Sequence, residues 1–193
     1  MSSAWAVLTV LVANVALVAI RAPHGQRSRA VPVARSFAGG LEKALLTFAW
    51  FSFFVPFVWM ATSLFDVAEF RLHPAAFVTG VAAYVVGLWV FHRSHADLGR
   101  AWSITLELRE DHALVTHGVY AHVRHAMYLG LLLFGLGQAL VLPNWIAGPT
   151  YLLAMVLITA LRLGPEERMM REAFGAEYDA YAARTRRLLP GIW

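Results

Sequence analysis

The sequence predicts an all-α, polytopic membrane protein with about five transmembrane helices. Hydrophobic residues make up 59% of the 193 residues and charged residues only 15%, whereas soluble domains carry about 25% charged residues. The apolar residues are gathered in runs close to the length of about 20 residues that a helix needs to cross a bilayer. We expect one domain over residues 1–193, with a three-span part over 1–93 and a second part over 94–193 that holds the last two spans and an amphipathic tail helix.

Five apolar runs mark the expected spans. The first run begins close to the amino-terminus, but it lacks the basic leader and the small-residue cleavage site of a signal peptide, so we expect a membrane helix there. The chain folds back between the last two runs at Pro143-Asn144, which makes these two spans a hairpin. The fourth run is slightly short for a bilayer. The runs cover roughly residues 4–20, 44–65, 74–91, 127–142 and 145–161.

The positions of the basic residues predict the orientation of the spans. With five spans, all of the 16 lysine and arginine residues except Arg71 fall on one side of the membrane. The positive-inside rule makes that side cytoplasmic, with the amino-terminus outside and the carboxyl-terminus inside. An even number of spans would scatter these charges over both faces.

Two polar segments lie on the cytoplasmic side of this topology. The loop over residues 94–123 is long, and long loops in compact domains are often functional. The tail over residues 165–184 has the pattern of a helix that begins at Pro165, with Glu166 and Glu167 in its first turn. Apolar and aromatic residues then recur at helical spacing, which predicts a helix that lies on the membrane or on the loop. These residues are Met170, Phe174, Tyr178 and Tyr181.

Two charged clusters flank the predicted hairpin, at residues 120–128 and 162–168. Because the hairpin returns to the face where it began, both clusters should meet at the cytoplasmic surface. Taken singly, Arg162 could extend its charged end to water, and Glu166 and Glu167 could complement a helix dipole. Together the clusters are more polar than a membrane anchor requires, and they indicate chemistry at the membrane surface. Their other polar members include Arg124, His125 and Tyr128.

Several kinds of site are not favoured by the sequence. The chain has no cysteine, which excludes a thiolate metal site and a cysteine nucleophile. Histidines stand three residues apart at His92 and His95 and again at His122 and His125, and neutral imidazole suits iron or zinc. Neither pair contains a carboxylate, so we expect no metal. The basic residues lie beside apolar runs, as membrane topology requires, and we expect no nucleic-acid partner.

Short motifs follow one another in a fixed order in the second part of the chain. They lie at residues 98–103, 114–120 and 124–130, at Arg162 with 166–168, at 174–178 with Tyr181, and at 184–190. In their order and spacing these motifs resemble the isoprenylcysteine carboxyl methyltransferase family of membrane enzymes. The resemblance covers about the last hundred residues. It departs from the family at Ala126, where proline usually follows the Arg-His pair.

The resemblance implies S-adenosylmethionine as the cofactor, held by a cytoplasmic cofactor-binding loop, the start of the fourth span and the tail. It implies Arg162 as the substrate-binding and catalytic residue, with Glu167 and Arg124 as further catalytic candidates. The acceptor would be a lipophilic or lipidated molecule, such as a prenylated cysteine, that enters from the membrane lipids. Its carboxylate is ionised at neutral pH and needs no general base. Cofactor contacts are implied for His112, Ala113, Leu114, Val115, Tyr120, His125, Tyr128 and Glu166.

Other functions fit part of the pattern. A phospholipid or other small-molecule N- or S-methyltransferase would use the same cofactor, and an amine acceptor would need Glu167 or His125 as a base. A sterol-type membrane reductase that uses NADPH shares a similar C-terminal core, although such enzymes are generally longer and have more spans. A non-catalytic membrane scaffold would leave Arg162, Glu166 and Arg124 without a common purpose.

Overall fold

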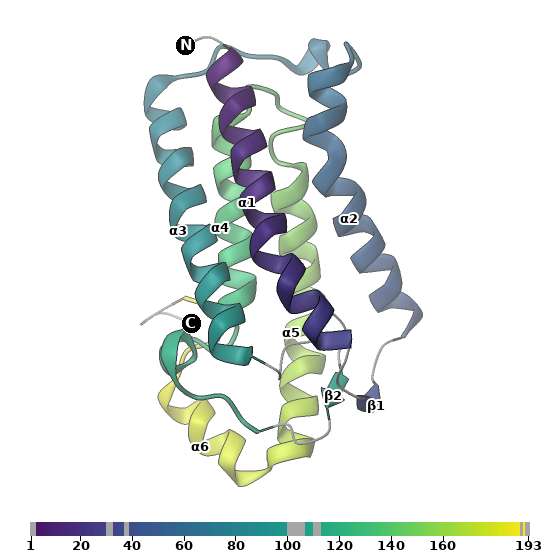
Figure 1. The fold of residues 1–193 in the computed structure, drawn as a ribbon, viewed down its shortest axis with the longest axis vertical. Coiled ribbons are helices and arrows are strands. Elements are labelled where there is room, and N and C mark those ends of the chain that lie inside the picture. The colour runs from purple at the N-terminus through teal and green to yellow at the C-terminus, as the bar shows by residue number, and fades with distance from the viewer. Residues whose placement is uncertain are drawn as a thin grey trace.

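Five long helices lie alongside one another in the computed structural model of the protein, and a sixth, short helix lies at one end of them (Figure 1). The structure describes residues 3–29, 33–36, 39–99, 107–109, 113–189 and 191. The prediction of an all-α membrane fold is confirmed. The helices are α1 (Ser3–Arg29), α2 (Gly40–Ala61), α3 (Pro74–Leu98), α4 (Ala126–Val141), α5 (Thr150–Phe174) and α6 (Ala176–Arg184), with short 3-10 turns η1 (Asp66–Ala68) and η3 (Gly118–Ala121).

A short antiparallel sheet, which the sequence did not predict, joins two of the connecting segments. Strand β1 (Val33–Ser36) pairs with strand β2 (Glu107–Arg109). The pairing ties the connection between α1 and α2 to the long connection that follows α3. Figure 1 shows both strands at the end of the bundle where α6 lies.

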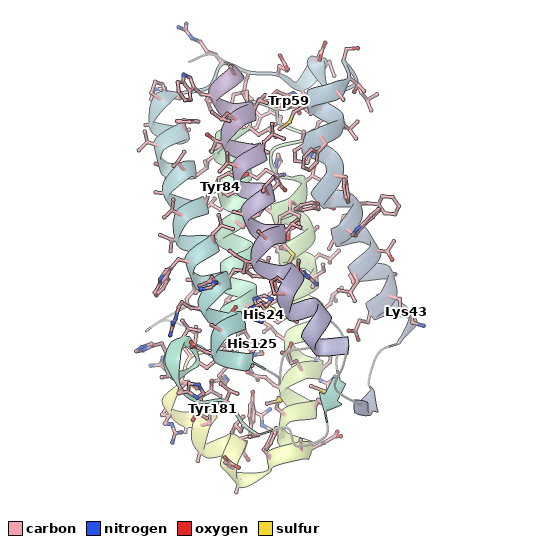
Figure 2. All side chains as sticks on the ribbon, in the orientation of Figure 1. His24, Lys43, Trp59, Tyr84, His125 and Tyr181 are labelled. Atoms are coloured by element: carbon pink, nitrogen blue, oxygen red, sulfur yellow. The ribbon has the colours of Figure 1, made fainter. Side chains whose placement is uncertain are left out.

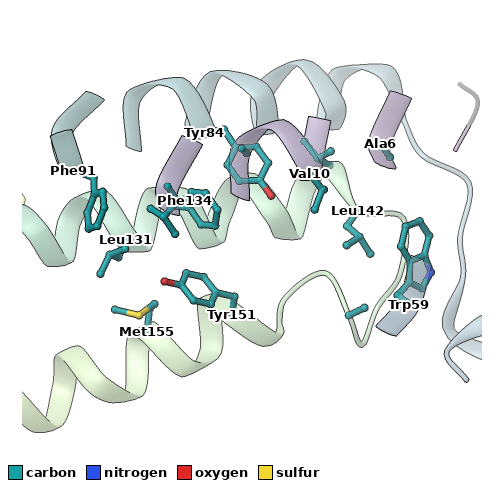
Figure 3. Close-up of a cluster of buried hydrophobic side chains, with 14 of the residues drawn as sticks. Ala6, Val10, Trp59, Tyr84, Phe91, Leu131, Phe134, Leu142, Tyr151 and Met155 are labelled. Carbon is teal, nitrogen blue, oxygen red and sulfur yellow. The ribbon is translucent and has the colours of Figure 1, made fainter. Parts of the chain in front are cut away.

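The helices are apolar on their outer faces as well as in the interior. α1, α2 and α3 are long and apolar enough to cross a membrane, whereas α4 is apolar but has only 16 residues. Large side chains such as Trp50, Val85 and Leu153 are more than half exposed. The interior holds a separate apolar cluster that includes Phe134 and Tyr151 (Figure 3). Helices that are hydrophobic all round are typical of membrane spans.

The prediction of a separate tail helix that begins at Pro165 is wrong. α5 continues from the last apolar span through Pro165 to Phe174, and it ends at Gly175, whose φ of 50° closes the helix. A proline inside a helix removes one backbone hydrogen bond and costs about 3 kcal/mol, which the packing of this helix offsets. Glu166 and Glu167 are therefore mid-helix, and the interpretation that they complement a helix dipole is wrong. One continuous helix carries the whole second cluster, and α6 forms the rest of the predicted tail.

Glycines bring the backbones of α3 and α4 into direct contact. A Cβ atom on Gly87 would lie 2.8 Å from the backbone nitrogen of Phe134, and one on Gly130 would lie 2.9 Å from that of Phe91. Gly80 and Gly137 continue the same seam towards the far end. Small residues at such crossings let membrane helices approach closely. This contact fixes the start of α4 against the last turns of α3, where the site begins.

The predicted turn between the last two spans is confirmed. The Asn144 side chain is buried; its Nδ2 donates to the Phe65 carbonyl at 2.7 Å, and its Oδ1 accepts from the backbone of Ile146 and Ala147 at 3.0 and 2.9 Å. The turn is thereby joined to the α2–α3 connection. The start of α4 and the end of α5 lie together at the opposite end of the bundle (Figure 1), so the two charged clusters meet as expected.

Candidate active site

The site begins with a short turn that α3 holds in place. The backbone N–H of Val119 donates to the Asp97 carboxylate at 2.9 Å, and the Tyr120 hydroxyl donates to the Ser94 carbonyl at 3.5 Å. Gly118 has a φ of 61°, and a Cβ there would overlap the Asp97 carboxylate. Glycine at this position therefore lets the segment before α4 close onto the end of α3.

Glu167 is the centre of a buried ionic cluster. Its Oε1 accepts from Arg124 Nη2 at 2.9 Å and from Arg124 Nε at 3.2 Å, and its Oε2 accepts from Arg187 Nη2 at 2.9 Å. The Nε2 of His125 lies 3.5 Å from Oε1. Burial alone would raise the pKa of the Glu167 carboxyl, but the close approach of His125 and the hydrogen bonds from Arg124 and Arg187 outweigh it and hold the pKa well below 4.5. The carboxyl group is therefore ionised at neutral pH.

Arg124 also binds the end of the chain. Its Nη1 donates to the carbonyl oxygens of Ala182 and Thr185 at 3.0 and 2.5 Å. The backbone N–H groups of Arg124 and His125 donate to the carbonyls of Arg186 and Arg187 at 2.8 and 3.0 Å. These hydrogen bonds hold the end of α6 and the residues that follow it against the start of α4.

A tyrosine of α6 adds a hydrogen bond to the turn that precedes α4. The Tyr181 hydroxyl donates to the Tyr120 carbonyl at 2.7 Å. Burial, together with the neighbouring Tyr178, raises the pKa of Tyr181 to about 12, so the hydroxyl keeps its proton and remains a donor. Figure 2 shows Tyr181 and His125 at the same end of the molecule.

Glu166 lies beside Glu167 in the chain but is held differently. The Tyr128 hydroxyl donates to Glu166 Oε2 at 2.8 Å, and His125 Nδ1 lies 3.9 Å from Oε1. The Glu166 side chain is 29% exposed, compared with 3% for that of Glu167. Glu166 can therefore reach a ligand, while Glu167 is enclosed by protein.

Arg162 is one turn before Glu166 on α5 and pairs with a residue that the sequence did not reveal. Its Nη2 lies 3.1 Å from Oε1 of Glu42, in the first turn of α2, and both side chains are about nine-tenths buried or more. Its guanidinium lies 5.9 Å from the centre of the Tyr128 ring. The one available signal for Glu42 is that it is an acidic residue at the start of an apolar span.

The remaining predicted cofactor residues lie in the segment before η3. Val115 packs against the apolar cluster of Val90 and Tyr120, Leu114 is half-buried, and Ala113 is exposed. His112 lies outside the described residues. This segment leads directly into Tyr120 and the ionic cluster, so the structure brings the described candidates to one end of the bundle.

The two histidine pairs have different partners. His95 is buried, its Nδ1 lies 2.8 Å from the Phe91 carbonyl, and its ring lies 5.0 Å from that of His24. His125 instead faces the two glutamates. Within the described ranges, no group of three or more histidine, aspartate or glutamate residues is arranged to hold a metal ion.

The fold and this cluster define a helical integral membrane protein with a polar site at one end of its bundle. The sequence profile of the isoprenylcysteine carboxyl methyltransferase family matches residues 76–172. The chain belongs to this family. Ala126, where the resemblance leads us to expect proline, is fully buried at the start of α4.

Named relatives agree with this assignment. A probable protein-S-isoprenylcysteine O-methyltransferase of Oryza sativa subsp. indica is 30% identical over 115 residues, which are 58% of this chain and 60% of the relative. The protein-S-isoprenylcysteine O-methyltransferase of Homo sapiens is 37% identical over 86 residues, which are 45% of this chain and 30% of the relative. The matched region thus covers less than two thirds of each of these relatives.

A solved structure has the same fold. It is the eukaryotic intramembrane Ras methyltransferase of the same family, which superposes with a TM-score of 0.55 at 22% identity and covers 81% of this chain and 55% of the solved chain. At this identity the similarity concerns the arrangement of helices. It extends the likeness beyond residues 76–172 to most of the bundle.

Proposed function

We propose that the protein is an integral membrane methyltransferase that moves a methyl group from S-adenosylmethionine to the carboxylate of a lipophilic acceptor. One observation carries this proposal: Arg162 and Glu166 stand one turn apart on α5, and both contact Tyr128. A cation suited to an anionic acceptor is thus held beside an anion suited to a cationic cofactor. The family description and the names of the relatives favour this function over the reductase alternative.

The donor set around Glu166 fits S-adenosylmethionine. The partly exposed carboxylate suits the positive amino group of this molecule, while Tyr128 donates a hydrogen bond to the carboxylate from the protein side and His125 lies beside it. When bound, the cofactor supplies an activated methyl group, so the protein mainly has to position the reactants. Further contacts are proposed for His112, Ala113, Leu114, Val115 and Tyr120.

Arg162 is proposed to bind and orient the acceptor. A guanidinium can hold a carboxylate through two parallel hydrogen bonds, which fixes direction as well as position. The acceptor carboxylate is already ionised at neutral pH, so the site needs no base to activate it. A prenylated cysteine, as in the names of the relatives, has the required carboxylate and lipid tail.

Arg124 and Glu167 are proposed to act by positioning. Each already binds the other, and Glu167 also binds Arg187. These contacts hold His125 and the turn of α5 that carries Glu166. A change at either residue would therefore alter the reaction through the geometry of neighbouring groups.

The polar end of the bundle is proposed to face the cytoplasm, as the excess of basic residues there predicts. The polar cofactor would then enter from water at this end. The lipid tail of the acceptor would remain in the bilayer and reach the site between helices, beside the exposed apolar faces.

Binding of S-adenosylmethionine and of NADPH to detergent-purified protein tests this function. We expect S-adenosylmethionine to bind and Glu166→Gln to weaken it by about tenfold or more, because a charge-assisted contact is lost. The control is Glu177→Gln, which changes an exposed carboxylate of α6 and should leave binding unchanged. Binding of NADPH alone, or of neither molecule, would reject the proposal.

A further inference from the structure

The acceptor arginine already has a carboxylate partner within the protein. Glu42 Oε1 lies 3.1 Å from Arg162 Nη2, and the exposed fractions of the two side chains are 6% and 10%. Glu42 comes from α2, before the family-matched residues 76–172. The start of α2 lies at the same end of the bundle as the second half of α5 (Figure 1).

Because Glu42 already pairs with Arg162, any anionic ligand of Arg162 must bind beside Glu42 or replace it. A buried guanidinium needs a counter-charge, and removing its partner leaves an uncompensated charge at high cost. Glu42 supplies the counter-charge in the ligand-free protein. Arg21 of α1 is a second, partly buried cation close enough to interact electrostatically with Arg162. It is Arg162 Nη2, however, that Glu42 occupies, so an acceptor carboxylate that binds there while Glu42 stays in place sets two anions against the same guanidinium in a poorly solvated site, which is unfavourable.

We propose that Glu42 competes with the acceptor carboxylate for Arg162 and is displaced each time an acceptor binds. This inference rests on the proposed function, since it takes Arg162 as the acceptor site. It makes Glu42 a specificity-determining residue: an acceptor must carry a charge strong enough to replace that of Glu42. Neutral lipids, which are abundant in a membrane, do not meet this condition.

The same exchange favours release of the product. In the proposed reaction a carboxylate oxygen of the acceptor would form a bond to the methyl carbon, and the bond from that carbon to the sulfonium sulfur would break, with its electron pair remaining on sulfur. The acceptor loses its negative charge and the sulfonium its positive charge, and no proton is transferred. The resulting ester is neutral, so it cannot replace a carboxylate on Arg162, and Glu42 returns to its partner.

The test compares two ligands that differ in charge on the same scaffold. N-acetyl-S-farnesylcysteine has the carboxylate, and its carboxamide is the neutral analogue. The ratio of their dissociation constants, carboxamide over carboxylate, is measured in detergent for the wild type and for Glu42→Gln. We expect the ratio to rise about fivefold or more in Glu42→Gln, because the competing charge is gone while the side chain keeps its size.

Two further variants separate competition from general damage. Glu42→Asp keeps the charge and should leave the ratio close to that of the wild type. Glu69→Gln makes the same change in a carboxylate at the other end of the bundle, where it accepts from Trp59 Nε1 at 3.1 Å, and should not change the ratio. Thermal unfolding of each variant shows whether it is folded.

A ratio that is unchanged or lower in folded Glu42→Gln overturns the inference. A lower ratio would mean that Glu42 orients Arg162 for the acceptor. Failure of the proposed function gives a different result, since the wild type would then neither bind S-adenosylmethionine nor methylate the carboxylate probe. A wild type that methylates the probe while Glu42→Gln leaves the ratio unchanged rejects the role of Glu42 alone.

Discussion

The hydroxyl of Tyr128 donates to the carboxylate of Glu166 at 2.8 Å. The ring of the same tyrosine lies 5.9 Å from the guanidinium of Arg162. One side chain of α4 therefore contacts both charged residues of α5, one with its polar end and one with its aromatic face. Tyr128 thus links the proposed cofactor and acceptor sites. Substitution can remove its contact with Glu166 while leaving its contact with Arg162.

Tyr128→Phe removes the hydroxyl and keeps the ring. We expect this variant to bind S-adenosylmethionine about tenfold more weakly, because a hydrogen bond to a charged group is worth about 1.5–3 kcal/mol and Glu166 keeps its place on α5, which favours the lower end of that range. The KM for a carboxylate acceptor should change less than the affinity for the cofactor, since the ring beneath Arg162 remains. Calorimetric titration and steady-state kinetics measure the two effects. A larger change in KM than in cofactor affinity would show that the hydroxyl serves the acceptor site more than the cofactor site.

Glu167→Gln should destabilise the polar end of the bundle. It leaves Arg124 and the partly exposed Arg187 without their shared counter-charge, and breaking a buried pair costs about 3–5 kcal/mol. Because Arg187 is 44% exposed, we expect a loss near the lower end, about 3 kcal/mol. Unfolding of the detergent-solubilised variant measures it. Arg186→Gln, at an exposed neighbour, is the control, and an equal loss in both variants would rule out a special role for Glu167.

Stability should also fall in acid because of Glu167. Its folded-state pKa lies below the ordinary value of 4.5, so the unfolded chain binds a proton more readily than the folded protein. The stabilisation is complete above pH 4.5 and is lost as the pH falls from there through the lower pKa of the folded state. Thermal unfolding from pH 7 to pH 3 measures this loss, and the slope below about pH 4.5 should be shallower in Glu167→Gln. Equal slopes would show that other carboxyl groups dominate.

Gly87→Ala should separate α3 from α4. The added Cβ would lie 2.8 Å from the Phe134 backbone nitrogen, and such overpacking costs about 1–3 kcal/mol. Gly25→Ala is the matched control, because a Cβ there meets no atom within 4 Å. We expect lower thermal stability and lower activity for Gly87→Ala alone. Wild-type stability in this variant would mean that the two backbones are not in close contact.

Hydropathy and charge were sufficient to predict the membrane fold and the meeting of the two clusters. Both depend on local information, namely the length of apolar runs and the basic residues beside them. The start of the tail helix could not be predicted in this way, because the signal of Pro165 was overridden by the packing of α5. The short strands were missed because four- and three-residue segments carry little periodicity.

The sequence indicated which residues form the site more readily than which residues contact one another there. Arg162, Glu166 and Glu167 stand out because charges are rare beside lipid. Their partners Glu42 and Arg187 come from other elements, and a side-chain pair between distant segments leaves no pattern in one sequence. Glu167 is buried among arginines, whereas Glu166 is partly exposed. This difference likewise depends on how α6 and the residues after it pack against α4 and α5.

Arg162 and Glu166 are proposed to have separate ligands, the acceptor for Arg162 and the cofactor for Glu166, and one measurement separates the two roles. This measurement uses Glu42→Gln as the background, so that the Glu42 carboxylate does not lose Arg162 as its partner when Arg162→Gln is added. In this background we predict that Arg162→Gln lowers kcat/KM for N-acetyl-S-farnesylcysteine by about 100-fold, equivalent to about 2.7 kcal/mol, and changes the affinity for S-adenosylmethionine less than about twofold. Parallel losses of acceptor turnover and cofactor affinity would show that Arg162 does not act on the acceptor separately from the cofactor.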